Sequence, residues 1–156
     1  MEFLAPLAET PLARALIASP TLYLLVNAAH ILGIAILFGA ILALDLCLLG
    51  LTPSVPLSAV APYLSRLSGV GVLIAILTGL CLFSVRPMEY AQNPAFLAKL
   101  GLVGLALTNV VFVHMGRSWQ AVLRGSGPSP GLQFSAVCSM VIWIAAVVAG
   151  RWIGFL

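Results

Sequence analysis

The chain has 156 residues, of which 62% are hydrophobic and only 7% are charged, and its formal net charge is +3. Its mean hydropathy of +1.18 excludes a water-soluble globular domain of this size, and the thinly spread positive charge gives no reason to expect nucleic acid as a partner. The composition predicts an integral membrane protein surrounded by a lipid bilayer.

The first predicted element is a short N-terminal segment, residues 1–20, which we expect to lie at the membrane interface. Thr10-Pro11 opens an apolar stretch that contains Arg14. Glu2 and Glu9 stand where a signal peptide would carry basic residues, so we expect no signal peptide and expect the first span to be retained.

Four apolar runs follow, each close to the roughly 20 helical residues needed to cross about 30 Å of hydrocarbon. We predict membrane spans at about 21–50, 64–85, 94–115 and 132–155. Ser19-Pro20 and Asn93-Pro94 each place a capping side chain before a proline that the first helical turn tolerates. The predicted fold is therefore all-α, an integral membrane four-helix bundle in one domain, residues 21–156.

Ionisable residues inside the predicted spans form two groups. In an up-and-down bundle the first and third spans run in the same direction, so His30 and Lys99, about 15 Å and 7.5 Å along their helices, lie toward one membrane face. Arg86 and Arg151 end the other two spans near that face. Such residues are functional-site candidates, because an unpaired charge within the membrane costs at least about 2.5 kcal/mol.

Imidazole is a common metal and haem ligand, whereas lysine can bind iron only as the neutral amine, a form that burial favours. We therefore consider His30 and Lys99 as candidate haem ligands, with Arg86 and Arg151 beside the haem propionates. The alternative is that Lys99 and Arg86 extend to lipid headgroups and that His30 binds a carbonyl group of a neighbouring helix.

The second group comprises Asp45, Arg66 and His114, toward the opposite face. We predict an ion pair between Asp45 and Arg66 at the ends of the first two spans, in preference to a proton relay or a metal site. His114 is either a ligand at a second site or an interfacial residue. It lies about 15 Å from His30 along the membrane normal, which is too far for both to bind one haem.

The three cysteines, Cys47, Cys81 and Cys138, form no CxxC pair and are interpreted as packing residues. The sequence also contains no catalytic triad pattern, nucleotide-binding loop or zinc-ligand spacing, which excludes hydrolase and kinase chemistry.

Three segments, Asn27 to Gly33, Ser68 to Gly79 and Asn93 to Leu100, resemble a superfamily of small bacterial membrane proteins. It includes the copper-resistance CopD-type domains and the HemJ-type protoporphyrinogen oxidases. In HemJ-type proteins a histidine in the first helix and a lysine opening a later helix are linked to haem b binding, and His30 and Lys99 stand at the similar positions. The resemblance implies haem b as cofactor and the bacterial cytoplasmic (inner) membrane as location. Any enzymatic activity would be that of a membrane oxidoreductase.

Three functional hypotheses follow. The first is a haem b-binding protein, alone or as a homo-oligomer, that transfers electrons to or from a partner redox protein or quinone. The second is a cofactor-free membrane anchor or structural subunit. The third is a CopD-like transporter of metal ions or small solutes. Transport needs a polar path between the two faces, for which the sequence offers only Asn27, Thr78, Thr108 and Asn109.

Overall fold

The computed structural model describes residues 4–52 and 54–155, and within these ranges the chain forms helices and short connections without a β-strand. The predicted all-α class is confirmed. The helices are α1 (Ala5–Ala8), α2 (Pro11–Ala18), α3 (Pro20–Leu48), α4 (Leu57–Val85), α5 (Pro87–Gln92), α6 (Pro94–Met115), α7 (Arg117–Leu123) and α8 (Pro130–Trp152), followed by the 3-10 turn η2 (Ile153–Phe155).

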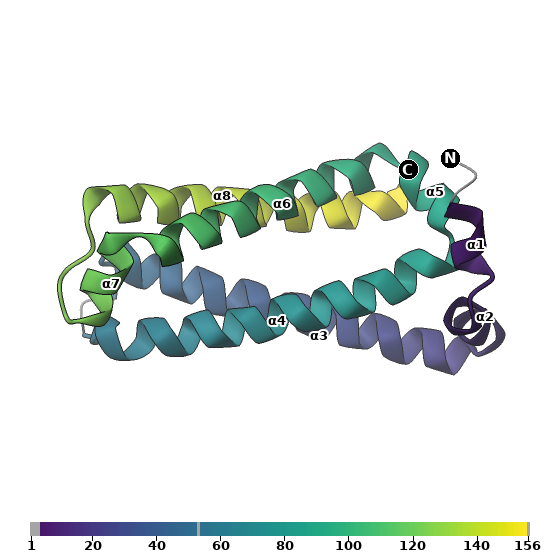
Figure 1. The fold of residues 1–156 in the computed structure, drawn as a ribbon, viewed down its shortest axis with the longest axis horizontal. Coiled ribbons are helices and arrows are strands. Elements are labelled where there is room, and N and C mark those ends of the chain that lie inside the picture. The colour runs from purple at the N-terminus through teal and green to yellow at the C-terminus, as the bar shows by residue number, and fades with distance from the viewer. Residues whose placement is uncertain (1–3, 53, 156) are drawn as a thin grey trace.

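Four of these helices, α3, α4, α6 and α8, are long and apolar enough to cross a membrane. They run alternately in opposite directions along one elongated bundle (Figure 1), and α1, α2, α5 and η2 gather at the same end. Large apolar side chains such as Leu24 and Phe112 are 63% and 73% exposed, as expected for helices whose outer surface faces lipid. The protein is thus an integral membrane protein.

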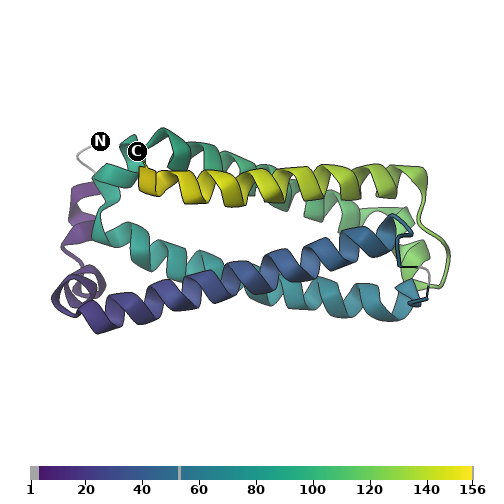
Figure 2. The ribbon, with the colours of Figure 1, turned by 180° about the vertical axis from the view of Figure 1, so that it is seen from behind.

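The bundle consists of two helix pairs. Consecutive helices α3 and α4 pack along each other, and so do α6 and α8, while contacts of α3 with α8 and of α4 with α7 join the pairs. The two views agree in placing α3 beside α4 and α6 beside α8 (Figure 1, Figure 2). The tightly packed core lies toward the α7 end and includes Leu44, Trp119, Val122 and Trp143.

Glycines allow α3 and α4 to approach closely. A Cβ atom at Gly71 would lie 2.7 Å from Leu37 Cα, and one at Gly33 would lie 2.9 Å from the backbone nitrogen of Ala75. Because real Cβ atoms do not approach backbone atoms so closely, only glycine fits at these two positions, and its small size lets the two backbones come together.

The predicted helix starts at Ser19 and Asn93 are confirmed. The Ser19 hydroxyl accepts a hydrogen bond from the backbone N–H of Leu22 at 3.3 Å, and Asn93 Oδ1 accepts from the N–H groups of Ala95 and Phe96 at 3.0 and 3.1 Å. The N-terminal segment contains the expected short helix, α2, with Thr10 as its capping residue. Residues 1–3 of that segment and residue 156 of the bundle domain lie outside the described residues.

Other boundaries differ from the prediction. Helix α4 begins at Leu57 instead of about residue 64, because Pro62 lies within the helix and does not close the preceding loop. The connections also contain two short helices, α5 and α7, which the span analysis did not predict. Both lengthen the structured part of the bundle ends.

Candidate functional site

His30 is held against α4 by a specific hydrogen bond. Its Nδ1 atom lies 2.9 Å from Thr78 Oγ1, and the Thr78 hydroxyl donates its own hydrogen to the carbonyl oxygen of Ile74 at 2.6 Å. Thr78 Oγ1 therefore accepts from the Nδ1–H of His30, and in the neutral ring Nε2 keeps a free electron pair. Metal-binding histidines typically donate their second N–H to a fixed acceptor in this way, so His30 is arranged as a ligand through Nε2.

Two glycines accommodate His30 and Lys99. A Cβ atom at Gly79 on α4 would lie 3.1 Å from His30 Cε1, so the imidazole ring packs closely over the helix backbone. A Cβ atom at Gly150 on α8 would lie 3.4 Å from Cδ, Cε and Nζ of Lys99, so the lysine side chain lies along α8. The structure therefore places His30 against α4 and Lys99 against α8.

Lys99 is only partly exposed, although it belongs to a membrane-spanning helix. Among the described residues no carboxylate lies within ion-pair distance of its amine. A buried ammonium without a counter-charge is unfavourable in the membrane. The amine is thus available either as a neutral ligand or as a cation for an anionic group of a bound molecule.

A cavity of about 1050 Å³ opens at the same end of the bundle, slightly above the usual range of about 300–1,000 Å³ for ligand sites. Its polar lining includes Tyr23, Arg86, Tyr90 and Asn93, and the remainder is largely apolar. His30 is not part of this lining. It follows Tyr23 by seven residues, so it lies about 10 Å deeper along nearly the same side of α3.

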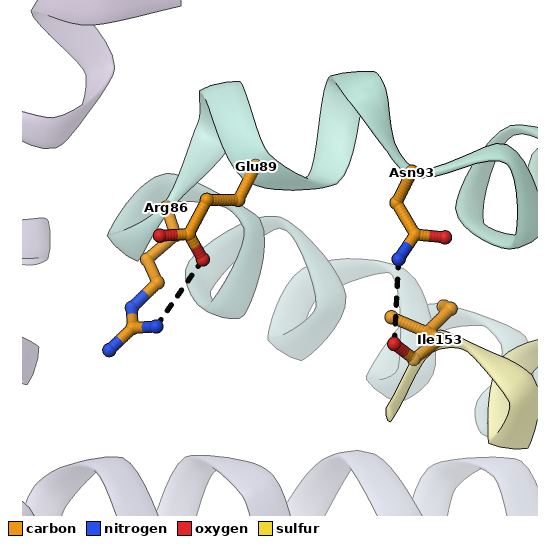
Figure 3. A network of polar contacts seen from close by, with 4 residues as sticks. All are labelled: Arg86, Glu89, Asn93 and Ile153. Atoms are coloured by element: carbon orange, nitrogen blue, oxygen red, sulfur yellow. Dashed lines mark hydrogen bonds and ion pairs between the residues drawn. The ribbon is translucent and has the colours of Figure 1, made fainter. Parts of the chain in front are cut away.

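The predicted arginines differ in their surroundings. Arg86 lines the cavity and forms an ion pair with Glu89, Nη1 to Oε2 3.3 Å, in which both side chains are more than 65% exposed (Figure 3). Arg151 is exposed, and its guanidinium lies 4.8 Å from the centroid of the Phe155 ring. Of the two residues, only Arg86 is therefore positioned to contact a molecule in the cavity.

Asn93 joins two ends of the chain at this cavity. Besides capping α6 through Oδ1, it donates from Nδ2 to the carbonyl oxygen of Ile153 at 3.4 Å (Figure 3). This bond fixes η2 beside the start of α6, and both segments line the cavity. The Asn93 side chain thus fixes the position of two segments that line the cavity, η2 and the start of α6.

The two cavity tyrosines, Tyr23 and Tyr90, were not among the residues predicted from the sequence. Burial raises the pKa of Tyr90, and the nearby hydroxyl group of Tyr23 raises it further, so Tyr90 stays protonated and can donate a hydrogen bond. Its ring also packs against those of Phe83 and Phe96, with centroids 6.2 and 5.4 Å away. The position of aromatic residues near helix ends, typical of membrane interfaces, was the signal that could have pointed to them.

His114 occupies a different environment at the other end of the bundle. Its Nδ1–H donates to the carbonyl oxygen of Val110 at 2.8 Å, and its Nε2 accepts from the Ser65 hydroxyl at 2.6 Å. Its ring centroid lies 4.7 Å from that of Trp119. Both nitrogens are engaged and the ring ties α6 to α4 and α7, so the geometry does not favour the predicted second ligand site.

The predicted ion pair between Asp45 and Arg66 is wrong. Asp45 is only 3% exposed and lines a small cavity with residues of α6, α7 and α8, whereas Arg66 is on the exposed surface of α4. No ion pair links the two, and within the described ranges no group of three or more His, Cys, Asp or Glu residues is arranged to hold a metal ion.

Together, the fold and these residues define a class: an all-helical membrane protein with four candidate spans, two of which carry a partly buried ionisable residue, His30 or Lys99. The family described as a family of unknown function, DUF6644, matches residues 20–156, and the chain belongs to that family. No curated protein and no solved structure matches the chain.

Proposed function

We propose that the protein binds haem b between its two helix pairs, with His30 as an axial ligand, and transfers electrons to or from a partner redox protein or membrane quinone. The cytoplasmic membrane of a bacterium would be the location. The observation that carries the proposal is the hydrogen bond from His30 to Thr78, which leaves Nε2 with a free electron pair. A bound haem would supply reversible one-electron chemistry.

The surroundings of His30 fit such a group. The ring is fixed on one side by Thr78 and packed over Gly79, so Nε2 has a defined direction with little freedom to lose on binding. The fixed orientation of the ring is therefore what supports a ligand role.

Lys99 and Arg86 have separate roles in this proposal. Lys99 would either occupy the second axial position as a neutral amine or pair with a propionate. Arg86, Tyr90 and Asn93 line the neighbouring cavity and offer hydrogen-bond donors for carboxylates. Arg151, which packs on Phe155, would join them only after leaving that contact.

Transport is less well supported. Of the four residues that could form a polar path, Asn27 and Thr108 are on the exposed surface. Thr78 is bonded to His30, and Asn109 is bonded to Ser135, whose hydroxyl donates to Asn109 Oδ1 at 2.5 Å. These side chains do not form a continuous route along the bundle.

The decisive experiment is a reduced-minus-oxidised visible spectrum of the full chain purified in detergent from cells supplied with a haem precursor. The wild type is expected to show b-type Soret and α bands, and His30→Ala is expected to lose them. A colourless wild type would contradict the proposal and favour the cofactor-free anchor.

Thr78→Val provides a sharper version of the test. It removes the acceptor for His30 Nδ1–H, and loss of such a supporting partner typically lowers metal affinity about 10–100-fold. Thr108→Val is the matched control, because the Thr108 hydroxyl is exposed and bonds only its own helix, to Gly104 O at 2.8 Å. If the two variants retain haem equally, the hydrogen bond from His30 to Thr78 does not contribute to haem binding, and the reasoning based on the geometry of His30 is refuted.

Lys99→Met separates the two roles of the lysine. If Lys99 ligates iron, its loss changes the low-spin signature in the visible and electron paramagnetic resonance spectra. If it pairs with a propionate, the spectra persist and the reduction potential shifts instead. Neither result tests the role of His30, which is tested by His30→Ala and Thr78→Val.

A further inference from the structure

Asp45 is the most deeply buried ionisable residue in the described part of the chain, and it takes part in no ion pair there. Its side chain is 3% exposed, and its Oδ2 atom has no hydrogen-bond partner. Ser139 on α8 is also 3% exposed and lies close to the Asp45 carboxyl group, although its hydroxyl has no partner within ideal hydrogen-bond geometry. Unsatisfied buried polar atoms are rare in native proteins and commonly mark a place where a water molecule or ion binds.

Both residues line the same cavity. It has a volume of about 20 Å³ and is lined by residues of α3, α6, α7 and α8. A volume of roughly 10–15 Å³ on this measure is enough for one water-sized particle. Three further polar residues line it, namely Asn109, His114 and Ser135. The cavity therefore has room for a single small occupant and oxygen atoms to contact it.

The charge of Asp45 has no compensation from the protein. Arg66 is exposed on α4, and the only other titratable residue lining the cavity is His114 on α6, because the lining residues of α7 and α8 are uncharged. The hydrogen bonds of His114 fit the neutral ring, with Nδ1 as donor and Nε2 as acceptor. An ionised carboxylate at this depth would be costly without a counter-charge.

We propose that the Asp45 cavity is a binding site for one small monovalent cation, Na⁺. Asp45 supplies the single negative charge, and the oxygen atoms of Ser139 and Asn109 supply neutral contacts. One carboxylate balances one positive charge, whereas a divalent ion would leave an excess charge inside the membrane. The size of the cavity excludes larger organic cations.

This site is independent of the proposed haem function. Asp45 follows His30 by fifteen residues on α3, which is about 22 Å along the helix. A colourless protein would leave the cation site untouched, and a protein insensitive to cations would leave the haem proposal untouched.

The test is thermal unfolding of the full chain in detergent, with NaCl replacing choline chloride at constant total chloride. Preferential binding to the folded state predicts a Tm that rises by roughly 3–5 °C for each tenfold increase in Na⁺ above the Kd. Asp45→Asn keeps the size of the side chain and removes its charge, so it is expected to abolish this dependence. Ser139→Ala is expected to weaken it.

Ser84→Ala is the matched control. Ser84 is buried to a similar degree, 8% exposed, but its hydroxyl bonds Cys81 O of its own helix at 2.7 Å, so its loss should leave the Na⁺ dependence unchanged. A Tm in choline chloride that depends on pH but not on Na⁺, with a dependence that Asp45→Asn removes, would mean that the Asp45 carboxyl group is simply protonated, and it would overturn the proposal.

The proposal is overturned if the Tm of the wild type does not respond to Na⁺, or if its response to Na⁺ persists in Asp45→Asn. The cavity would then hold water alone. Should Asp45→Asn fail to fold, the comparison of Ser139→Ala with Ser84→Ala decides, because equal Na⁺ dependence in these two variants also refutes a cation bound beside Ser139.

Discussion

Replacement of Gly71 by alanine should destabilise the bundle through the contact between α3 and α4. The new Cβ atom would lie 2.7 Å from Leu37 Cα and 2.9 Å from Gly33 O, roughly 1 Å closer than the 3.5–4.0 Å optimum for carbon atoms. Both neighbours are backbone atoms that cannot rotate away. The two helices must therefore separate locally.

The expected magnitude follows from two opposing terms. Overpacking of this kind costs about 1–3 kcal/mol, while replacing a helical glycine by alanine gains about 0.5–1 kcal/mol. We expect a net loss of about 1–2 kcal/mol, which is a factor of roughly 5–30 in the ratio of folded to unfolded protein. Because α3 carries His30 and α4 carries Thr78, haem retention should fall in parallel.

The assay is equilibrium unfolding in mixed micelles of mild detergent and dodecyl sulfate, followed by circular dichroism, with Gly69→Ala as the matched control. Gly69 is on the same helix, and a Cβ atom there would meet nothing within 4 Å. Stabilities of the two variants within about 0.5 kcal/mol of each other, the scatter of ordinary surface substitutions, would refute the packing argument.

Three further predictions concern single side chains. Ser65→Ala leaves His114 Nε2 without its donor and should lower the unfolding free energy by about 1–3 kcal/mol, measured in the same micelle assay; an unchanged stability would mean that water replaces the hydroxyl. Gly79→Ala places a Cβ atom 3.1 Å from His30 Cε1, so it should tilt the ring and weaken haem binding in a titration, and wild-type affinity would contradict the packing of the ring on α4. Arg86→Ala removes an exposed ion pair and should change Tm little, because such pairs contribute about 0–1 kcal/mol; a large fall in Tm would show a structural role that its exposure does not explain.

The depths of His30 and Lys99 along their helices could be predicted from the sequence because they depend only on where each helix starts. Parallel helices of known starting points place residues at known heights, and 1.5 Å per residue is sufficient for that purpose. The helix starts were themselves readable, since Ser19 and Asn93 cap helices by a local hydrogen bond. Depth and helix ends are thus properties of the local chain.

The partners of Asp45 could not be predicted because they depend on the rotation of each helix about its axis. In a soluble protein the apolar face identifies the inside, but α3 and α4 are apolar on nearly all sides, so the lipid face and the inner face look alike. Arg66 therefore seemed available to Asp45 although it points outward. The roles of Thr78 and Ser65 were hidden for the same reason, since both contact residues 48 or 49 positions away.

The pairing of the bundle also bears on how the chain is assembled. Each pair, α3 with α4 and α6 with α8, consists of consecutive spans (Figure 2), so each can enter the bilayer and close as a helical hairpin before the other exists. The segment between them, Arg86 to Asn93, is the natural place to divide the chain. Two fragments produced separately and cut within α5 should reassociate in the membrane, and the proposed haem site would then form only in the reassembled protein, since His30 belongs to one fragment and Lys99 to the other.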